Sequence, residues 1–134
     1  MIVLGRLDGT TSWEPLSEPN VNMVNHTLVA LFDNDLFFAN AGVFRKKMHQ
    51  LLVTFPASRH VVFDGVAMAE IDFTGMTILS QVVADLEKDN VSVSFARVNT
   101  GVKKTLATSF DPLIRKIPTF ESVNEAVTAA VDQP

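Results

Sequence analysis

Hydrophobic positions along this chain fall into short continuous runs and longer stretches with helical spacing. The run Val61-Val62-Phe63 ends at Asp64, and consecutive apolar positions of this kind predict a strand that is buried on both faces. From Met76 to Leu86 the apolar residues recur every three or four positions, which is the spacing of one face of a helix. The two patterns together predict a strand, a turn and a helix that opens at or next to Thr74.

Further strands and helices are predicted along the rest of the chain in the same way. Residues 8–22 contain glycine, prolines and hydroxyl residues and predict a long irregular loop. We expect strands at residues 2–4 (a short edge strand), 27–32, 36–38, 91–98 and 117–120, with a hairpin turn at 33–35. We expect a first helix from the cap Asn40 to before Pro56, and a second from Thr74 to about Lys88, with Asn90 after its end. A third helix should run from the cap Thr100 until Asp111-Pro112 breaks the pattern. A fourth should begin at the capping box of Ser122 and Glu125.

Strands that alternate with helices predict an α/β fold with a largely parallel sheet, and the early hairpin makes that sheet mixed. The 134 residues are enough for one domain with a single core, so residues 1–134 are expected to form one unit. No internal repeat or low-complexity tract divides the chain.

Composition excludes several classes of function. The chain is 47% hydrophobic and 19% charged, which indicates a globular protein. Its net charge of −4 gives no electrostatic basis for binding nucleic acid. The absence of cysteine excludes disulfides, thiolate metal sites and a cysteine nucleophile. No apolar run has the roughly 18 residues of a membrane span, and the first residues do not have the pattern of a signal peptide.

The turn before the predicted helix at Thr74 carries a recognisable motif. Asp72, Thr74 and Gly75 match a D-x-[S/T]-G pattern between a strand and a helix, and in this respect the chain resembles the STAS family, the domains shared by sulfate transporters and anti-sigma factor antagonists. The resemblance covers nearly the whole chain. It implies a mixed, mostly parallel sheet with helices packed mainly on one face. It also implies a phosphoacceptor at Thr74 within a regulatory loop of Asp72, Phe73 and Gly75.

Within that family, the chain is most similar to the cytoplasmic C-terminal domain of SulP-type anion permeases. Four features carry this likeness: Leu4-Gly5-Arg6, the run at residues 36–41, the bulky Phe73 before the hydroxyl residue, and the tail at residues 117–127. The resemblance implies a non-enzymatic regulatory domain, excised from a larger sulfate or anion transporter and held at the cytoplasmic face of the membrane. Its implied partners are the transmembrane domain of that transporter, a second copy of the domain, and a kinase or nucleotide.

Alternative interpretations stay open at each of these residues. Thr74 is either a phosphoacceptor, as in a free-standing anti-sigma factor antagonist, or a simple N-cap, and Thr is a preferred cap whether or not a kinase exists. Asp64, Glu70 and Asp72 are either an acid–base or magnesium cluster of a hydrolase, or residues that end a strand and begin a turn. The second interpretation is simpler, because no nucleophile and base stand beside them, and we expect no catalytic residue.

Ligand sites are less well defined in the sequence. His26, His49 and His60 lack metal-ligand spacing, so no metal site is expected, and Arg45-Lys46-Lys47 is typical of a solvated helix face. No cofactor is expected. The phosphate-binding glycine loops of nucleotide sites are absent, so a nucleotide-binding sensor would depend on helix N-termini at Asn40, Thr74 and Thr100. If Phe37, Phe38 and Phe73 are exposed together, they would form a docking surface.

Overall fold

The computed structural model describes residues 1–33 and 41–131. Strands and helices alternate over most of the chain, as the hydrophobic pattern predicts. In chain order the elements are β1 (Ile2–Leu7), β2 (Trp13–Pro15), β3 (Val21–Asn22), β4 (Thr27–Leu31), α1 (Ala41–Thr54), β5 (His60–Asp64), α2 (Phe73–Lys88), β6 (Ser92–Ala96), α3 (Thr100–Ala107), α4 (Pro112–Arg115), β7 (Thr119–Phe120) and α5 (Val123–Val131).

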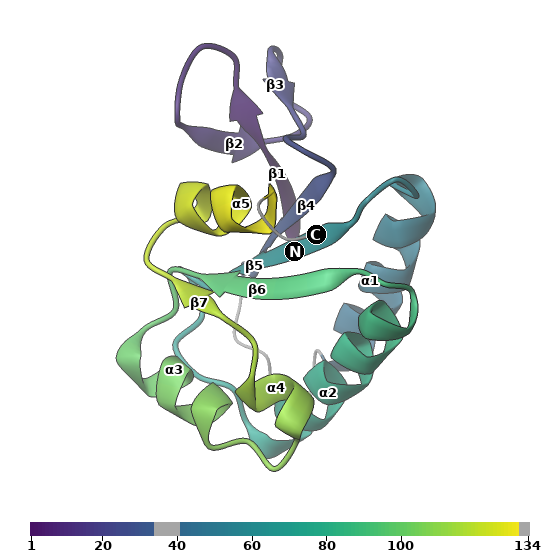
Figure 1. Ribbon diagram of the computed structural model, residues 1–134, viewed down its shortest axis with the longest axis vertical. Helices are drawn as coiled ribbons and strands as arrows, with labels where there is room; N and C mark the ends of the chain where they lie inside the picture. The colour runs from purple at the N-terminus through teal and green to yellow at the C-terminus, as the bar shows by residue number, and fades with distance from the viewer. Residues whose placement is uncertain (34–40, 132–134) are drawn as a thin grey trace.

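The strands form one mixed sheet in the order β2-β1-β4-β5-β6-β7, and β3 pairs with β1 (Figure 1). Strands β4 to β7 run parallel to one another, whereas β1 is antiparallel to β4. The prediction of a mixed, mostly parallel sheet is therefore confirmed. The prediction that residues 2–4 form an edge strand is wrong, because β2 pairs with the outer side of β1.

Residues 8–22 are not an irregular loop throughout, since β2 and β3 lie within them. Two contacts with α5 hold this region: the indole N–H of Trp13 donates to Asn124 Oδ1 at 2.8 Å, and Asn124 Nδ2 donates to the Thr11 carbonyl at 2.9 Å. Gly5 is required in β1, because a Cβ there would lie 2.7 Å from the Asn22 carbonyl. Sequence patterns missed these strands because each is only two or three residues long.

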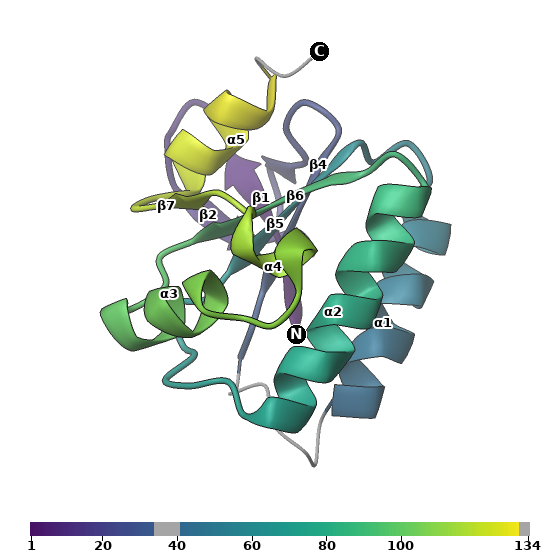
Figure 2. The same ribbon diagram turned by 60° about the horizontal axis from the view of Figure 1, so that its bottom comes forward.

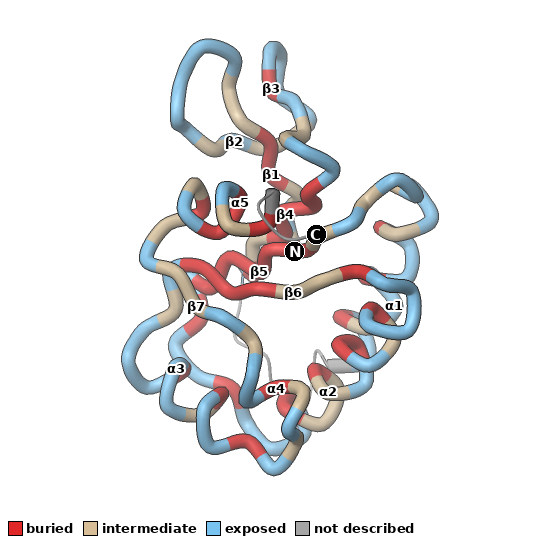
Figure 3. The backbone as a smooth tube through the Cα atoms, viewed as in Figure 1, coloured by how far each residue is buried: buried red, intermediate tan, exposed pale blue. Residues whose placement is uncertain are grey.

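Helices cover the two faces of the sheet unequally, with α1 to α4 on one face and α5 on the other (Figure 2). Strand β5 contributes side chains to both faces of the sheet. Phe63 packs into the core beneath α1 to α4, and Val62 packs into the smaller core beneath α5. This explains why β5 reads as a continuous apolar run, since alternate residues enter two different cores. Figure 3 shows the buried central strands between helices that are exposed on their outer sides. The prediction that helices pack mainly on one face is confirmed.

Three helix starts differ from the sequence predictions. Asp72 caps α2 in place of Thr74, and Asn99 caps α3 in place of Thr100. Asp111 caps the short helix α4, which begins at Pro112 where a break in helical pattern was predicted. Asp and Asn are preferred over Thr at the N-cap, which explains the caps of α2 and α3. Pro112 fits the first turn of a helix, where its missing N–H has no partner to lose.

Other boundaries follow the predictions closely. Helix α1 ends at Thr54, before Pro56, and Asn90 has the positive φ of 59° expected after the end of α2. The predicted cap of α5 is confirmed, because the Glu125 N–H donates to Ser122 Oγ at 3.1 Å. The expected strand at 36–38 and the expected cap Asn40 lie outside the described residues.

Candidate functional site at the start of helix α2

The start of α2 is organised by a carboxylate cap. Asp72 Oδ1 accepts a hydrogen bond from the Gly75 N–H at 2.7 Å, so the negative group sits at the positive end of the helix. Thr74 is the second residue of the helix and is exposed to solvent. Thr74 therefore presents its hydroxyl at the surface and does not cap the helix, which corrects the simple N-cap interpretation.

Substitution of the two polar residues at this helix start should separate their roles. Asp72→Ala should lower the free energy of unfolding by about 1 kcal/mol, because it removes the cap. Thr74→Ala should change it by less than about 0.5 kcal/mol, as expected for an exposed residue without a capping bond. Urea denaturation of the two variants beside the unchanged protein measures both effects. A larger loss for Thr74→Ala than for Asp72→Ala would contradict this assignment.

An exposed aromatic pair lies beside Thr74. The side chain of Phe73 is 78% exposed and that of Phe110 is 61% exposed, and their ring centroids are 6.2 Å apart. The hydroxyl of Ser80 on α2 donates to Asp111 Oδ2 at 2.5 Å, which holds the turn between α3 and α4 against α2. We call Phe73 and Phe110 the aromatic pair.

The aromatic pair agrees only in part with the docking surface predicted from the sequence. Phe73 is exposed, as that prediction requires, whereas Phe37 and Phe38 lie outside the described residues. Phe110 was missed, because nothing in its Ser-Phe-Asp-Pro turn indicates which helix the turn will meet. The bond between Ser80 and Asp111 holds the turn that carries Phe110 against α2, beside Phe73.

The loop that leads into α2 is held by the neighbouring turn between β6 and α3. Asn99 Nδ2 donates to the carbonyls of Met68 and Ala69 at 3.3 and 3.0 Å. The other end of the same amide, Oδ1, accepts from the Val102 N–H at 2.8 Å and caps α3. One side chain therefore fixes the starts of both helices relative to each other, and the sequence predicted no such role for Asn99.

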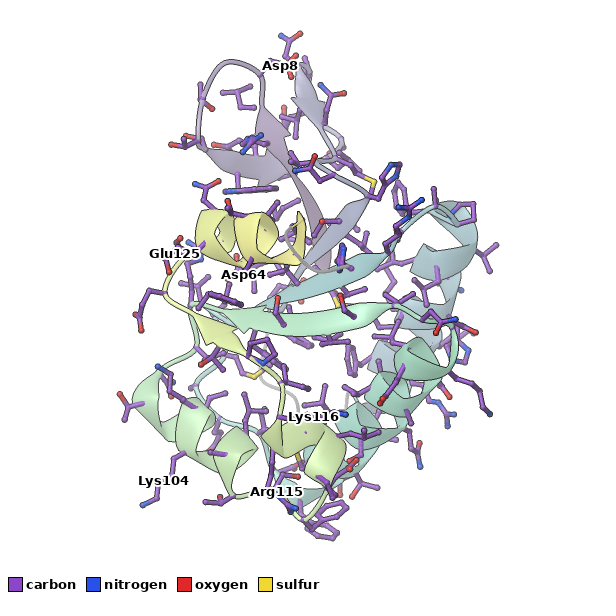
Figure 4. The ribbon with its side chains drawn as sticks, viewed as in Figure 1. Asp8, Asp64, Lys104, Arg115, Lys116 and Glu125 are labelled. Carbon is purple, nitrogen blue, oxygen red and sulfur yellow. The ribbon has the colours of Figure 1, made fainter. Side chains whose placement is uncertain are left out.

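Asp64 lies at the carboxyl end of β5, beneath α5 (Figure 4), and forms an ion pair with Arg97. Asp64 is completely buried, and Arg97 Nε donates to its Oδ1 at 3.0 Å while Arg97 Nη2 donates to Oδ2. The same Oδ1 accepts from the Val66 N–H at 3.2 Å. The hydrogen bond to Asp64 raises the pKa of Arg97 above its ordinary value. The pair therefore joins β5 to the end of β6 as a charged contact, and the sequence analysis missed Arg97.

The three carboxylates considered for acid–base chemistry have different positions. Glu70 is exposed in the loop before α2. Asp64 is buried against Arg97, and Asp72 caps α2 at the surface. Both also accept a hydrogen bond from a main-chain N–H two or three residues ahead, as the turn interpretation predicts. Within residues 1–33 and 41–131 no group of three or more His, Asp or Glu side chains could hold a metal ion.

His49 and Arg45 on α1 have partners on α2. His49 lies 3.1 Å from Asp85 on α2, and the hydrogen bond from His49 lowers the pKa of Asp85. Arg45 also reaches α2, where it donates to Gln81 at 2.9 Å and to Asp85 at 3.3 Å. Arg45 therefore crosses between two helices and does not simply face solvent.

Protonation of His60 should make stability depend on pH. Burial, with a smaller effect of the charge on Arg59, lowers the pKa of His60 below its ordinary value. Because the unfolded chain then binds the proton more tightly, stability should fall as the pH drops below about 6.5. His60→Gln should lose this part of the pH dependence. Urea denaturation between about pH 8 and pH 5 measures it, and an identical pH slope in both proteins would contradict the assignment.

Two of the residues predicted to contact a phosphate lie at helix starts in the described part of the chain. Thr100 is the first residue of α3 and is exposed, with Asn99 as the cap. Thr74 is exposed at α2, and Asn40 lies outside the described residues. Contact of these residues with a nucleotide stays a prediction.

The protein is an α/β domain with a mixed sheet, and the capped start of α2 displays the exposed hydroxyl residue Thr74. The sequence model of one family, the STAS domain, matches residues 18–126. The chain belongs to this family, whose members are regulatory or interaction modules. No curated protein matches the chain.

Solved structures with the same fold come from transporters and from antagonists. The murine anion transporter Slc26a9 in its inward-facing state matches with a TM-score of 0.84 at 16% identity, over 98% of this chain and 22% of the transporter. The SulP transporter STAS domain from Vibrio cholerae matches with a TM-score of 0.64 at 18% identity, over 84% of this chain and 87% of that one. A putative anti-sigma factor antagonist from Thermotoga maritima matches with a TM-score of 0.70 at 14% identity, over 81% of this chain and 91% of that one.

These matches show that the chain shares its fold with both the transporter domains and the antagonists. The chain spans about a fifth of the length of the murine transporter. Among the residues that the structure describes, no helix is both long enough and apolar enough to cross a bilayer.

Proposed function

We propose that this chain is the regulatory and interaction domain of a SulP-type anion transporter and acts at the cytoplasmic face of the membrane. The observation that carries the proposal is the extent of the match to the murine anion transporter, which includes 98% of the chain. The matches to the Vibrio cholerae SulP domain and to free-standing antagonists cover 81–84% of it. The exposed aromatic pair supports the proposal, because two neighbouring exposed rings are typical of a contact surface.

In this proposal the domain contacts the rest of the transporter through the start of α2. The aromatic pair supplies apolar area, and the cap at Asp72 together with the bonds of Asn99 holds α2 in a fixed position behind it. The domain performs no chemistry on the anion. Its contribution is to change how the transmembrane part folds, assembles or responds to a signal.

Fractionation of the native cells tests the proposal. An antibody raised to this domain should detect, in the membrane fraction, a band several-fold heavier than 14.7 kDa. Extraction with high salt should leave that band in the membrane, because the domain would be joined covalently to membrane-spanning segments. A soluble band at 14.7 kDa would refute the proposal.

A second candidate function is a free-standing anti-sigma factor antagonist, favoured by the exposed hydroxyl of Thr74 at the start of α2. A phosphate there would lie near the positive end of the helix but close to the carboxylate of Asp72. Incubation with a partner-switching kinase and ATP tests this function. Stoichiometric modification that Thr74→Ala abolishes, together with a soluble native protein, would favour it over the transporter.

A further inference from the structure

The outer edge of β6 is only partly covered by β7. All five residues of β6 pair with β5 on one side, but on the other side only Phe95 and Ala96 pair with β7. Figure 1 shows β7 beside the end of β6, with the first part of β6 left uncovered on that side. The edge beside Ser92 and Val93 is therefore open to another strand.

Main-chain groups of Val93 face this open edge. The N–H groups of Phe95 and Arg97 donate toward β7, to the carbonyls of Pro118 at 3.0 Å and Phe120 at 2.9 Å. Alternate residues of a strand direct their N–H and C=O groups to the same side, so those of Val93 point the same way. The Ser92 N–H instead donates toward β5, to the Arg59 carbonyl at 3.1 Å, as this alternation requires.

The chain opposite Val93 cannot continue the pairing. The residue that precedes β7 is Pro118, which has no N–H. The Ile117 N–H is already bonded to the Ile114 carbonyl at 3.1 Å, at the end of α4. Strand β7 therefore begins only after Ile117 and Pro118. Because neither residue can donate a main-chain hydrogen bond to β6, the edge of β6 beside Val93 stays open.

A groove of about 460 Å³ lies along this open edge. Its apolar walls come from three elements and include Val83 on α2, Val93 on β6 and Leu113 on α4. Glu87 and Lys116 form an ion pair of 3.7 Å beside it, and both side chains are more than half exposed. The volume lies within the range of ligand-binding clefts, about 300–1,000 Å³.

We propose that this groove binds an extended peptide segment, which adds a strand to the edge of β6. The N–H and C=O of Val93 would bond the main chain of the peptide, and the apolar walls would hold every second side chain. Glu87 and Lys116 carry opposite charges on one rim and therefore complement a segment that bears both an acidic and a basic residue. The inference rests on the edge of β6 and is independent of the proposed function.

A peptide titration tests the inference. The probe is an acetylated and amidated hexapeptide that alternates polar residues with valine and has one glutamate and one lysine among the polar residues. It is added up to about 1 mM to the ¹⁵N-labelled domain and followed by NMR. The expected result is saturable shifts of the amide signals of Val93 and of the groove residues, with slower hydrogen exchange at the Val93 N–H. The same peptide with N-methyl groups at alternate residues should bind at least about tenfold more weakly.

A variant of the domain supplies the matched control. Val93→Pro removes one edge donor, and proline is tolerated where a strand N–H faces outward. This variant should keep the fold and weaken the peptide at least about tenfold. Three results would overturn the inference: no saturable shift, equal binding of the N-methylated peptide, or a Val93 N–H already protected from exchange in the free domain. Dimerisation of the free domain that Val93→Pro abolishes would overturn it too, because a second copy would then occupy the edge.

Discussion

Phe63→Ala should lower the free energy of unfolding by about 3–5 kcal/mol, among the largest losses expected from a single side chain here. Phe63 is completely buried in β5. Its ring lies 5.4–5.8 Å, centroid to centroid, from those of Phe32, Phe44 and Phe95. Alanine would remove these ring contacts and leave a cavity that strands paired on both sides of β5 cannot close.

Chemical denaturation followed by circular dichroism measures this loss. Val53→Ala is the matched control, because Val53 is also apolar but is 80% exposed on α1. The control should change stability by no more than about 0.5 kcal/mol. A loss below about 1 kcal/mol for Phe63→Ala would show that the four rings do not form the centre of the core.

Arg97→Met should be the second large effect, with a loss of about 2–4 kcal/mol. Removal of one partner from a fully buried ion pair costs about 3–5 kcal/mol, and the 39% exposure of the Arg97 side chain reduces that figure here. The reason for the loss is the position of Asp64, which has no exposed surface and would keep a buried charge without its guanidinium. Methionine preserves most of the length of the side chain, so the variant removes mainly the charge and its hydrogen bonds.

Asp64→Asn supplies the comparison for the ion pair. It should cost less than Arg97→Met, because Arg97 can turn its charge toward water whereas Asp64 cannot. The double variant should be more stable than Arg97→Met alone, since it no longer buries a carboxylate. Urea denaturation of the three proteins gives the order directly. Equal losses in both single variants would contradict this account of the pair.

Features that depend on local chemistry were predictable from the sequence. The continuous apolar run of β5 and the helical spacing of α2 each indicated the correct element, because burial on both faces or on one face leaves a pattern in sequence. The D-x-[S/T]-G motif pointed to the correct helix start. It also contained the actual cap, Asp72, although the helix was expected to open at or next to Thr74.

Features that depend on contacts between distant residues were not predictable. Arg97 meets Asp64 across 33 positions of sequence, and Phe110 meets Phe73 where the turn before α4 packs against α2. Nothing near Arg97 or Phe110 in the sequence indicates these partners. Strands β2 and β3 escaped detection for another reason, because each has only two or three residues and is too short to show a pattern.

Site-specific photo-crosslinking in native cells tests the central claim, that this domain works by contact through the start of α2. The crosslinker benzoyl-phenylalanine would replace Phe73 in the full-length protein, and the control would carry it in place of Val53, an exposed apolar residue on α1. The account predicts a strong crosslink from position 73 to a membrane-embedded segment of the same transporter, and a weak one from position 53. A crosslink from position 73 to a soluble kinase, or none above the control, would contradict it.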